Sequence, residues 1–319
     1  GRGKSFLMPK VFITGHQGMV GSALVRAIES HSEFSLLVAD RNQLNLMNQS
    51  QVEEFLSSER PDIIINAAAK VGGIYANSTY PAEFIHQNLV LNSNLIHSAW
   101  KNGVSRFLNL GSSCIYPRRS EQPIKEEYLL TGSLEKTNEA YALAKIAALE
   151  MCRHYRHQYD VLFHSAMPTN LYGPGDNYNL ENSHVLPALI RKFHEAKETK
   201  SSEVAIWGSG TPRRELMHVD DLAAGVLFLL NQDNPPDWVN LGTGIDHSIQ
   251  EIAILVKKIV GYEGEMINDT TKPDGMPLKR LDVSLADKLG WKARISLEDG
   301  IRSTYVDFCR SLVDKSARL

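Results

Sequence analysis

Short apolar runs alternate with longer amphipathic stretches over the first half of the chain. The short runs are rich in Val, Ile, Leu and Phe and stop at glycine, proline or a polar cluster, which is typical of strands. In the stretches between them, apolar residues recur three and four positions apart, which is typical of helices. The predicted strands cover residues 10–14, 34–39, 62–67, 106–110 and 161–167, and the predicted helices cover residues 20–30, 49–58, 81–100 and 139–156.

This alternation predicts an α/β protein. A strand followed by a helix and a second strand forms a parallel β-α-β unit, and a series of such units places helices on both faces of one sheet. The run DIIIN (residues 62–66) is apolar at successive positions, as expected for a strand that is buried on both faces. We therefore expect a doubly wound parallel (Rossmann) sheet with a smaller C-terminal α/β substrate lobe.

The alternation breaks after about residue 172. We expect a dinucleotide-binding domain at residues 8–172, with its sheet completed by about residues 215–245, and an interleaved substrate-binding lobe at residues 173–319. Their junction would form a cleft at the carboxyl ends of the parallel strands. In this half the sequence predicts a polar loop at 177–183, helices at 185–196, 222–230, 250–260 and from 297 onward, and strands at 204–207 and 238–241, the latter returning to the first sheet.

Composition and charge narrow the classes of function. The chain has 37 acidic and 34 basic residues, and this near balance argues against a nucleic-acid-binding protein. No apolar run approaches the length needed to span a membrane. A hydrophobic fraction of 43% is ordinary for a globular protein. These features leave an enzyme or binding protein of the cytoplasm, without a nucleic-acid or membrane partner.

The cysteines and the first residues add two expectations. Cys114, Cys152 and Cys309 are odd in number and widely spaced, which argues against a disulfide framework and against a zinc site, so we expect no metal. The apolar run before residue 9 is too short for a signal peptide. We expect Met8 to be the native start and residues 1–7 to be a remnant of an expression tag.

Gly15, Gly18 and Gly21 form the pattern GxxGxxG where the first predicted strand ends and the first predicted helix begins. In a chain with 22 glycines, such a triplet arises by chance roughly 0.1 times, so its position matters more than the match itself. Glycines there permit a tight turn and let the backbone approach a pyrophosphate at the helix N-terminus. The pattern predicts a dinucleotide site.

The end of the second predicted strand leaves the choice of dinucleotide open. Asp40 follows Gly21 by 19 residues, and an acid at that distance accepts hydrogen bonds from the adenosine ribose of NAD. Arg41 comes next and could pair with the 2′-phosphate of NADP. From these residues alone the two cofactors are evenly matched.

Tyr141 and Lys145 form a YxxxK pattern inside a predicted helix, where positions i and i+4 share a face. We expect the Lys145 ammonium to lower the pKa of the Tyr141 phenol and to bind the nicotinamide ribose. Tyr141 would then act as a general acid on a carbonyl that receives a hydride. The residues after the fourth predicted strand, Ser112, Ser113 and Cys114, would supply a third hydrogen-bonding group.

With these motifs in the order glycine loop, serine, Tyr–Lys, the chain resembles the extended short-chain dehydrogenases that act on nucleotide sugars. The resemblance narrows to the GDP-L-fucose synthase family, which are GDP-4-keto-6-deoxy-D-mannose 3,5-epimerase-4-reductases, and covers about residues 9–310. The motifs that carry it are NAAA (66–69), AAKVGGI (68–74), GSSCIYP (111–117), MPTNLYGP (167–174), NSHV (182–185), WGSGTP (207–212) and KPDG (272–275).

The resemblance implies how the reaction centre works. Cys114 and His184 match the family's proton-transfer pair, which removes and returns the hydrogens at C3 and C5 beside the C4 ketone. Tyr141 would stabilise the enolate oxygen during both epimerisations and protonate O4 during reduction. Ser112 matches the family's serine, with Ser113 as the alternative.

The resemblance also implies the binding residues. Trp207, Arg214 and Asp274 match GDP-sugar contacts, and Lys192 stands where the family has an arginine. Gln17 stands where members often have an arginine toward the 2′-phosphate, but Arg41 matches a family cofactor position, so we favour NADP over NAD. The full cofactor set is Gly15, Gln17, Gly18, Met19, Val20, Gly21, Asp40, Arg41, Ala67, Ala68, Leu110, Tyr141, Lys145, Pro168, Asn170, Leu171 and His184, and the full substrate set is Ser113, Cys114, Asn170, Lys192, Trp207, Arg214 and Asp274.

Other interpretations of the sequence stay open. A relative that acts on another GDP-4-keto sugar, such as a 3,6-dideoxyhexose of the colitose pathway or a 6-deoxyheptose, would keep every motif. A dinucleotide-sensing regulator would be expected to lose Tyr141 or Lys145, and both are present. The pair Asp220 and Asp221 is interpreted as a helix cap and scaffold. The family implies a homodimer, for which the helices at 81–100 and 139–156 are candidates.

Overall fold

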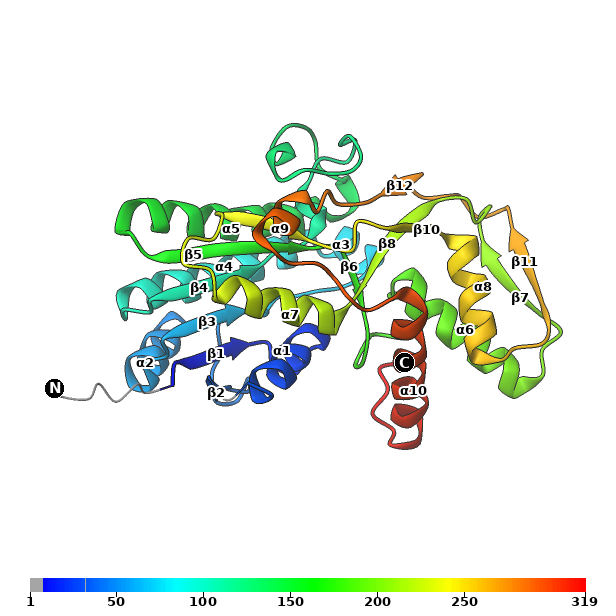
Figure 1. Ribbon diagram of the computed structural model, residues 1–319, viewed down its shortest axis with the longest axis horizontal. Helices are drawn as coiled ribbons and strands as arrows, with labels where there is room; N and C mark the ends of the chain where they lie inside the picture. The colour runs from blue at the N-terminus through cyan, green and yellow to red at the C-terminus, as the bar shows by residue number, and fades with distance from the viewer. Residues whose placement is uncertain (1–7, 32) are drawn as a thin grey trace.

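The computed structural model describes residues 8–31 and 33–319, so our expectation for residues 1–7 lies outside the described part of the chain. The first sheet consists of β1 (Lys10–Thr14), β2 (Ser35–Leu37), β3 (Ile63–Asn66), β4 (Arg106–Leu110), β5 (Leu162–Pro168) and β9 (Trp238–Leu241). All its pairs are parallel, in the order β2-β1-β3-β4-β5-β9 (Figure 1). The order reverses beside β1, which confirms the predicted doubly wound sheet.

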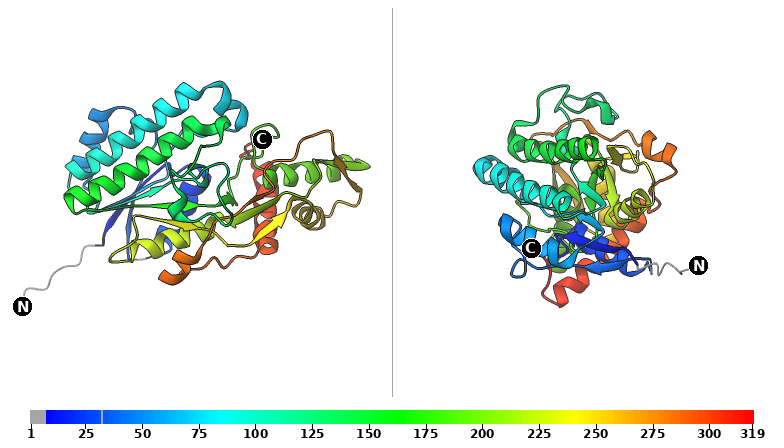
Figure 2. Two further views of the ribbon diagram at one scale, coloured as in Figure 1. Left: turned by 90° about the horizontal axis from the view of Figure 1, so that it is seen from above. Right: turned by 90° about the vertical axis from the view of Figure 1, so that its left-hand side faces the viewer.

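Helices cover both faces of this sheet (Figure 2). One face carries α2 (Gln49–Glu59), α4 (Pro81–Lys101) and α5 (Glu139–Tyr159), and the other carries α1 (Met19–Glu29), α7 (Val219–Leu230) and α9 (Ser284–Leu289). Two separate apolar cores result, because side chains of each strand alternate between the faces. Phe12 of β1 packs toward α2 and α4, whereas Ile13 packs toward α1 and α7.

A second lobe follows the first sheet and lies to the right in Figure 1. Its strands are β6 (Asn170–Tyr172), β7 (Glu203–Trp207), β8 (Arg213–His218), β10 (Asp246–Ser248), β11 (Glu265–Asp269) and β12 (Leu278–Lys279), and its helices are α6 (Val185–Thr199), α8 (Ile249–Val260) and α10 (Leu297–Val313). The strand β8 pairs with β6, β10 and β12, while β7 pairs with β11. An apolar core between α6, α8 and α10 holds this lobe together.

The structure corrects some predicted elements. The second strand covers three residues instead of 34–39, and the helix predicted at 222–230 begins at Val219. The sequence interpretation missed the helices α3 (Ile74–Thr79) and α9, and it missed β8, because Arg213, Arg214 and Glu215 give its first half no apolar pattern. The strand predicted at 238–241 does return to the first sheet, beside β5.

Within residues 8–31 and 33–319, we find no helix that combines the length and the apolar character needed to cross a bilayer.

Candidate active site

The glycine-rich loop joins β1 to α1. Gly15 has a φ of +66°, and a Cβ atom on Gly21 would lie 1.8 Å from the Gly15 carbonyl oxygen, so only glycines allow the first turn of α1 to pack on the loop. Gly18 is the N-cap and offers no capping side chain, and the first turn contains no acidic residue. The first-turn N–H groups of a helix have no partner within the helix. The loop therefore fits the phosphates of a dinucleotide.

Asp40 and Arg41 follow β2. One carboxylate oxygen of Asp40 accepts hydrogen bonds from the backbone N–H groups of Asn42 (2.8 Å) and Gln43 (2.9 Å). This side chain shapes its own turn, which is a common use of Asp. Arg41 is exposed. Because Asp40 is engaged in its own turn and Arg41 is exposed, Arg41 is the better placed of the two to bind the adenosine end of a cofactor.

Ala67, at the end of β3, completes the wall opposite the glycine loop. A Cβ atom on Gly15 would lie 2.8 Å from the Ala67 carbonyl oxygen. The Thr14 hydroxyl accepts hydrogen bonds from the N–H groups of Ala67 (3.1 Å) and Ala68 (3.2 Å). These bonds fix the ends of β1 and β3 at the same edge of the sheet, where the predicted cofactor residues Ala67 and Ala68 lie.

Tyr141 and Lys145 lie in the first turns of α5, and the Lys145 ammonium is 5.6 Å from the centre of the Tyr141 ring. Lys145 is 4% exposed and donates a hydrogen bond to the Leu110 carbonyl oxygen (3.2 Å) at the end of β4. Burial lowers the pKa of Lys145 to about 8. Burial also raises the pKa of Tyr141, and the Cys114 charge raises it further. The net shift of the Tyr141 pKa is thus upward and is dominated by burial, not by the lowering that we expected from Lys145.

The residues after β4 turn into a short 3₁₀ segment from Ser113 to Ile115. The Ser112 hydroxyl caps it by accepting a hydrogen bond from the Cys114 N–H (3.4 Å), while Ser113 is buried. Burial raises the pKa of the Cys114 thiol, while a hydrogen bond from Ser112 and the charges of Lys279 and Lys145 lower it. Ser112 is thus the serine whose hydroxyl acts on both the Cys114 backbone and its thiol. The charge of the Cys114 thiolate raises the pKa of both Tyr141 and Lys145, so the three groups lie in one site.

His184 is the N-cap residue of α6, and its side chain makes no capping bond. His184 is exposed at the residue level. The atoms packed around its ring still desolvate it in part and lower the pKa of the imidazole, and the nearby Lys279 charge lowers it further, so the ring is neutral near pH 7. The charge of Lys279 therefore acts on both His184 and Cys114, which come from different lobes.

Lys279 of β12 is a site residue that sequence reasoning missed. Burial lowers the pKa of its ammonium, the Cys114 charge raises it, and the Arg214 charge lowers it. In the part of the chain that the structure describes, no oxygen accepts a hydrogen bond from this ammonium. A partly buried cation without a carboxylate partner is costly unless an anion binds there. Only the short distance from the KPDG motif (272–275) could have drawn attention to it.

Trp207 lies at the end of β7 and is 58% exposed. The ammonium groups of Lys192 and Lys272 lie 4.5 Å and 5.1 Å from the centres of its rings, which is cation–π distance. Lys272 was not predicted. Asp274 accepts hydrogen bonds from the Ser209 N–H (2.8 Å) and the Ser209 hydroxyl (2.6 Å), so it holds the loop after β7 next to this group.

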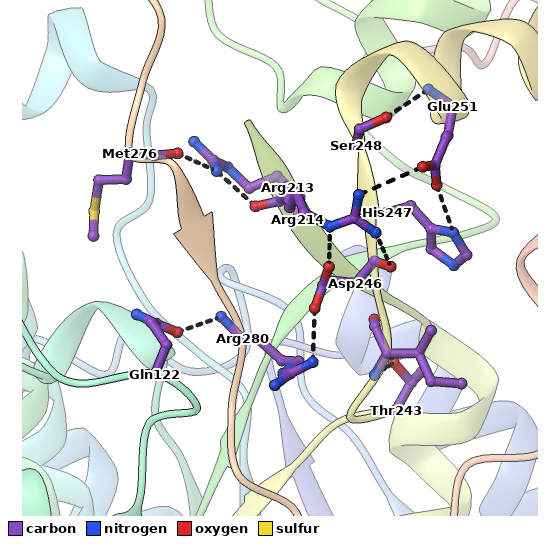
Figure 3. Close-up of polar contacts among 11 residues, drawn as sticks. Gln122, Arg213, Arg214, Thr243, Asp246, His247, Ser248, Glu251, Met276 and Arg280 are labelled. Atoms are coloured by element: carbon purple, nitrogen blue, oxygen red, sulfur yellow. Dashed lines mark hydrogen bonds and ion pairs between the residues drawn. The ribbon is translucent and has the colours of Figure 1, made fainter. Parts of the chain in front are cut away.

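Arg214 lies on β8 and is held by backbone oxygens (Figure 3). Its guanidinium donates hydrogen bonds to the carbonyl oxygens of Arg213 (2.7 Å) and Met276 (2.6 Å). Asp246 binds both Arg213 and Arg280 and so pins β12 beside β8. Since Arg214 itself has no carboxylate partner among the described residues, its remaining donors are available to an anion.

The other predicted cofactor residues lie where β5 ends and β6 begins. Pro168 is the last residue of β5, and Asn170 and Leu171 belong to β6. The Asn170 amide donates a hydrogen bond to the Glu215 carbonyl oxygen (3.4 Å), which adds to the pairing of β6 with β8. This places the three residues at the junction of the two lobes.

Comparison with known proteins agrees with this geometry. The model of the NAD dependent epimerase/dehydratase family matches residues 11–242. The chain belongs to this family. The chain is similar to an Arabidopsis thaliana protein named putative GDP-L-fucose synthase 2, to which it is 52% identical over 96% of this chain and 93% of the other. The GDP-L-fucose synthase of Escherichia coli strain K12 is 50% identical over 93% of this chain and 95% of its own.

Two further members of the family widen the comparison. The GDP-L-colitose synthase of Yersinia pseudotuberculosis is 38% identical over 92% of this chain and 96% of its own. The structure of a GDP-L-fucose synthetase from Naegleria fowleri bound to NADP superposes with a TM-score of 0.90, at 26% identity, over 98% of this chain and 96% of the other. The similarity to these relatives therefore covers both lobes of the chain.

Proposed function

We propose that this protein is an NADP-dependent epimerase and reductase. It epimerises GDP-4-keto-6-deoxy-D-mannose at C3 and C5 and then reduces C4, which yields GDP-L-fucose. The observation that carries the proposal is the grouping of Cys114, His184 and Lys279 beside the Tyr141–Lys145 pair. A reductase alone needs only Tyr141 and Lys145, whereas a thiol and a neutral imidazole beside one cation suit proton transfer at carbon. The relatives named GDP-L-fucose synthase support the substrate.

The glycine loop and the N-terminus of α1 would hold the phosphates of NADP, and Arg41 the 2′-phosphate. Asp40 is engaged in its own turn, which favours NADP over NAD. Lys145 would bind the nicotinamide ribose from its place beside Leu110. When bound, NADPH supplies the hydride for C4.

Epimerisation needs one group that removes a proton from carbon and another that returns one on the opposite face. The C4 ketone acidifies the hydrogens at C3 and C5, and Tyr141 stabilises the enolate oxygen with a hydrogen bond. Cys114 and His184 come from different lobes, and the Lys279 charge acts on both. We assign them to opposite faces of the sugar ring. The Lys279 ammonium stabilises whichever anion, thiolate or enolate, is present.

Reduction uses the same oxygen-binding group. Burial raises the pKa of Tyr141, so the phenol keeps its proton at neutral pH and can donate it to O4 as the hydride arrives at C4. The Ser112 hydroxyl, which follows β4, provides a second hydrogen bond to this oxygen.

The second lobe would bind the GDP part of the substrate. Arg214 is the cation suited to the diphosphate, because it keeps donors free for it. Trp207 offers an exposed aromatic face to the guanosine, and Lys192 and Asp274 flank it. Lys192 keeps the charge of an arginine but not its bidentate geometry.

The test is to incubate the purified protein with GDP-4-keto-6-deoxy-D-mannose and NADPH, or NADH in parallel, and to identify the product by NMR. We expect GDP-L-fucose, with NADPH used faster than NADH. A C4-reduced product that keeps the manno configuration at C3 and C5 would show that the protein has no epimerase activity. Turnover only with a 3,6-dideoxy or heptose substrate would favour a function like that of the colitose synthase.

The domain division and the assembly are part of the proposal. Residues 8–172 would bind the dinucleotide and residues 173–319 the sugar nucleotide. We place the dimer contact on α4 and α5, which pack side by side and leave Leu89 and Leu143 exposed. The three cysteines are free thiols, which suits the reducing cytoplasm. Analytical ultracentrifugation of wild type and Leu143→Glu tests the dimer, since the variant should sediment as a monomer.

A further inference from the structure

The segment that follows α10 reaches the glycine-rich loop. Arg318 donates a hydrogen bond from its guanidinium to the backbone carbonyl oxygen of Gln17 (2.8 Å). Gln17 lies between Gly15 and Gly18, and the Gly18 N–H points inward to the Gly15 carbonyl oxygen (3.1 Å). The two groups of the peptide that joins Gln17 to Gly18 are therefore both bound, one inside the loop and one by Arg318.

A second contact fixes Arg318 itself. The Tyr178 N–H donates a hydrogen bond to the Arg318 carbonyl oxygen (2.7 Å), and Asn177 forms a parallel bridge with Arg318. The loop that carries them also packs on α1, because a Cβ atom on Gly175 would lie 3.9 Å from the Met19 Cα atom. Three segments far apart in sequence thus meet at the start of α1, and Figure 2 shows the chain end at the junction of the two lobes.

Arg318 keeps its positive charge unpaired at this place. The charge of Arg318 acts on Asp176, which is 6% exposed, and burial raises the pKa of that carboxyl to about 7. Near neutral pH Asp176 is therefore only partly ionised, and in the described residues it makes no ion pair with Arg318. Arginine stays charged at every physiological pH. An exposed guanidinium bound to a phosphate-binding loop adds to the positive potential of the α1 N-terminus.

We infer that Arg318 is a positioning residue for the dinucleotide: it holds the phosphate-binding loop in its bound shape through the Gln17 carbonyl. A loop ordered in advance loses less entropy when the ligand binds. The same contact ties the loop to residues 173–178 of the second lobe, so cofactor binding and the order of that segment support each other. This inference requires only that a nicotinamide dinucleotide binds the glycine loop, and it is independent of which sugar is the substrate.

The test compares Arg318→Gln with Arg318→Lys and with the matched control Arg310→Gln. Arg310 is exposed on α10, and its guanidinium makes no hydrogen bond or ion pair in the described part of the chain. Binding of NADPH and of NADH to the full-length protein is measured by fluorescence titration without substrate. We expect Arg318→Gln to raise both dissociation constants about tenfold, Arg318→Lys to raise them less, and Arg310→Gln to leave them unchanged.

Two outcomes would overturn the inference. Unchanged dissociation constants in Arg318→Gln would show that the contact does not position the loop. A loss confined to NADPH would make Arg318 a 2′-phosphate ligand and not a positioning residue. If wild type itself bound neither dinucleotide, the proposed function would fail instead, so the two failures are distinct.

Hydrogen exchange separates positioning from a general loss of stability. In wild type, NADPH should slow exchange in the peptide that contains Tyr178, whose N–H is bound to Arg318. In Arg318→Gln this peptide should exchange faster and respond less to NADPH, while peptides of β3 and β4 stay protected. Uniformly faster exchange over the whole chain would contradict a local role.

Discussion

At the residue scale, the site depends on how one cation affects two neutral groups. The pKa of Cys114 is raised by burial, and that of His184 is lowered by burial, so both groups are largely uncharged near pH 7. The Lys279 charge lowers the pKa of the Cys114 thiol, against the effect of burial, and it lowers the pKa of the His184 imidazole in the same direction as burial. Formation of the thiolate that removes a proton from carbon therefore depends on the Lys279 charge, whereas the neutral imidazole can accept a proton directly.

Replacing Lys279 by Met should move the pH dependence of epimerisation. The ammonium favours the thiolate, so its loss raises the pKa of Cys114. Because the thiolate is the form that removes a proton, the rising limb of the pH–rate profile should shift to higher pH. The measurement is the rate of solvent-deuterium incorporation into the 4-keto sugar against pH. Lys279→Arg keeps the charge and should keep the profile, and identical profiles for wild type and Lys279→Met would exclude this coupling.

Cys114→Ser should slow exchange of the C3 and C5 hydrogens by about a hundredfold, the usual loss for a missing general base. A hydroxyl is far less acidic than a thiol, so it cannot form the needed anion. Binding of NADPH, measured by titration, should change little. Cys309→Ser is the matched control, because Cys309 is also a free, partly exposed thiol but lies on α10. Normal deuterium incorporation in Cys114→Ser would remove this residue as the base.

Tyr141→Phe should lower the rate of C4 reduction at least a hundredfold, because O4 loses its proton donor. The ring and its packing remain, so the dissociation constant of NADPH should stay within twofold of wild type. NADPH oxidation under single-turnover conditions measures the step. Tyr80→Phe removes a phenol from an exposed ring and serves as control. Undiminished reduction in Tyr141→Phe would rule out the assigned role.

At the element scale, the sequence predicted best where one pattern decides the structure. The strand at 106–110 was predicted at its true bounds, since its apolar run is buried on both faces. The strand β8 was missed, because its Arg213, Arg214 and Glu215 are explained only by partners from β6, β10 and β12. The site residues likewise differ in whether the sequence alone reveals them. Tyr141 and Lys145 follow from helical spacing, whereas Lys279 follows only from tertiary contact.

The junction of β1 and α1 offers a prediction at this scale. A Cβ atom on Gly21 would lie 1.8 Å from the Gly15 carbonyl oxygen, so Gly21→Ala must push the helix away from the loop. We expect the dissociation constant of NADPH to rise at least tenfold, because the first-turn N–H groups no longer converge on the phosphates. Gly103→Ala is the control, since it has a φ of +74° with open space around it and should destabilise the fold without weakening NADPH binding. Equal NADPH affinity in Gly21→Ala and wild type would contradict the close packing.

At the scale of the whole molecule, buried polar bonds join parts that the apolar cores leave separate. Glu215 of β8 is fully buried and accepts hydrogen bonds from the Thr169 hydroxyl (2.7 Å), the Leu281 N–H (2.9 Å) and the Gly244 N–H (2.8 Å). Thr169 directly follows β5, so this carboxyl group connects the first sheet with the second. Although the net charge is only −3, single charged groups such as Glu215 connect separate parts of the molecule.

Arg106 of β4 is a second such group. Its guanidinium donates hydrogen bonds to the carbonyl oxygens of Leu229 (2.9 Å) and Leu230 (2.7 Å) at the end of α7, where the helix dipole favours a cation. It also donates to Nε2 of His164 on the neighbouring strand β5 (3.1 Å), so that nitrogen must be unprotonated. Burial and the nearby arginine charge lower the pKa of His164 to about 3.

This histidine makes the fold sensitive to acid. In the unfolded chain an imidazole takes up a proton below about pH 6.5, whereas the folded protein leaves His164 neutral down to about pH 3. The unfolded state therefore binds more protons in this window. The contribution of His164 to the free energy of unfolding should fall by up to about 1.4 kcal/mol per pH unit as the pH decreases. His164→Gln keeps an acceptor for Arg106 but cannot titrate. Urea unfolding from pH 7 to pH 4 should show a shallower decline for this variant than for wild type or for the exposed-site control His157→Gln, and parallel curves for all three would mean that His164 does not limit acid stability.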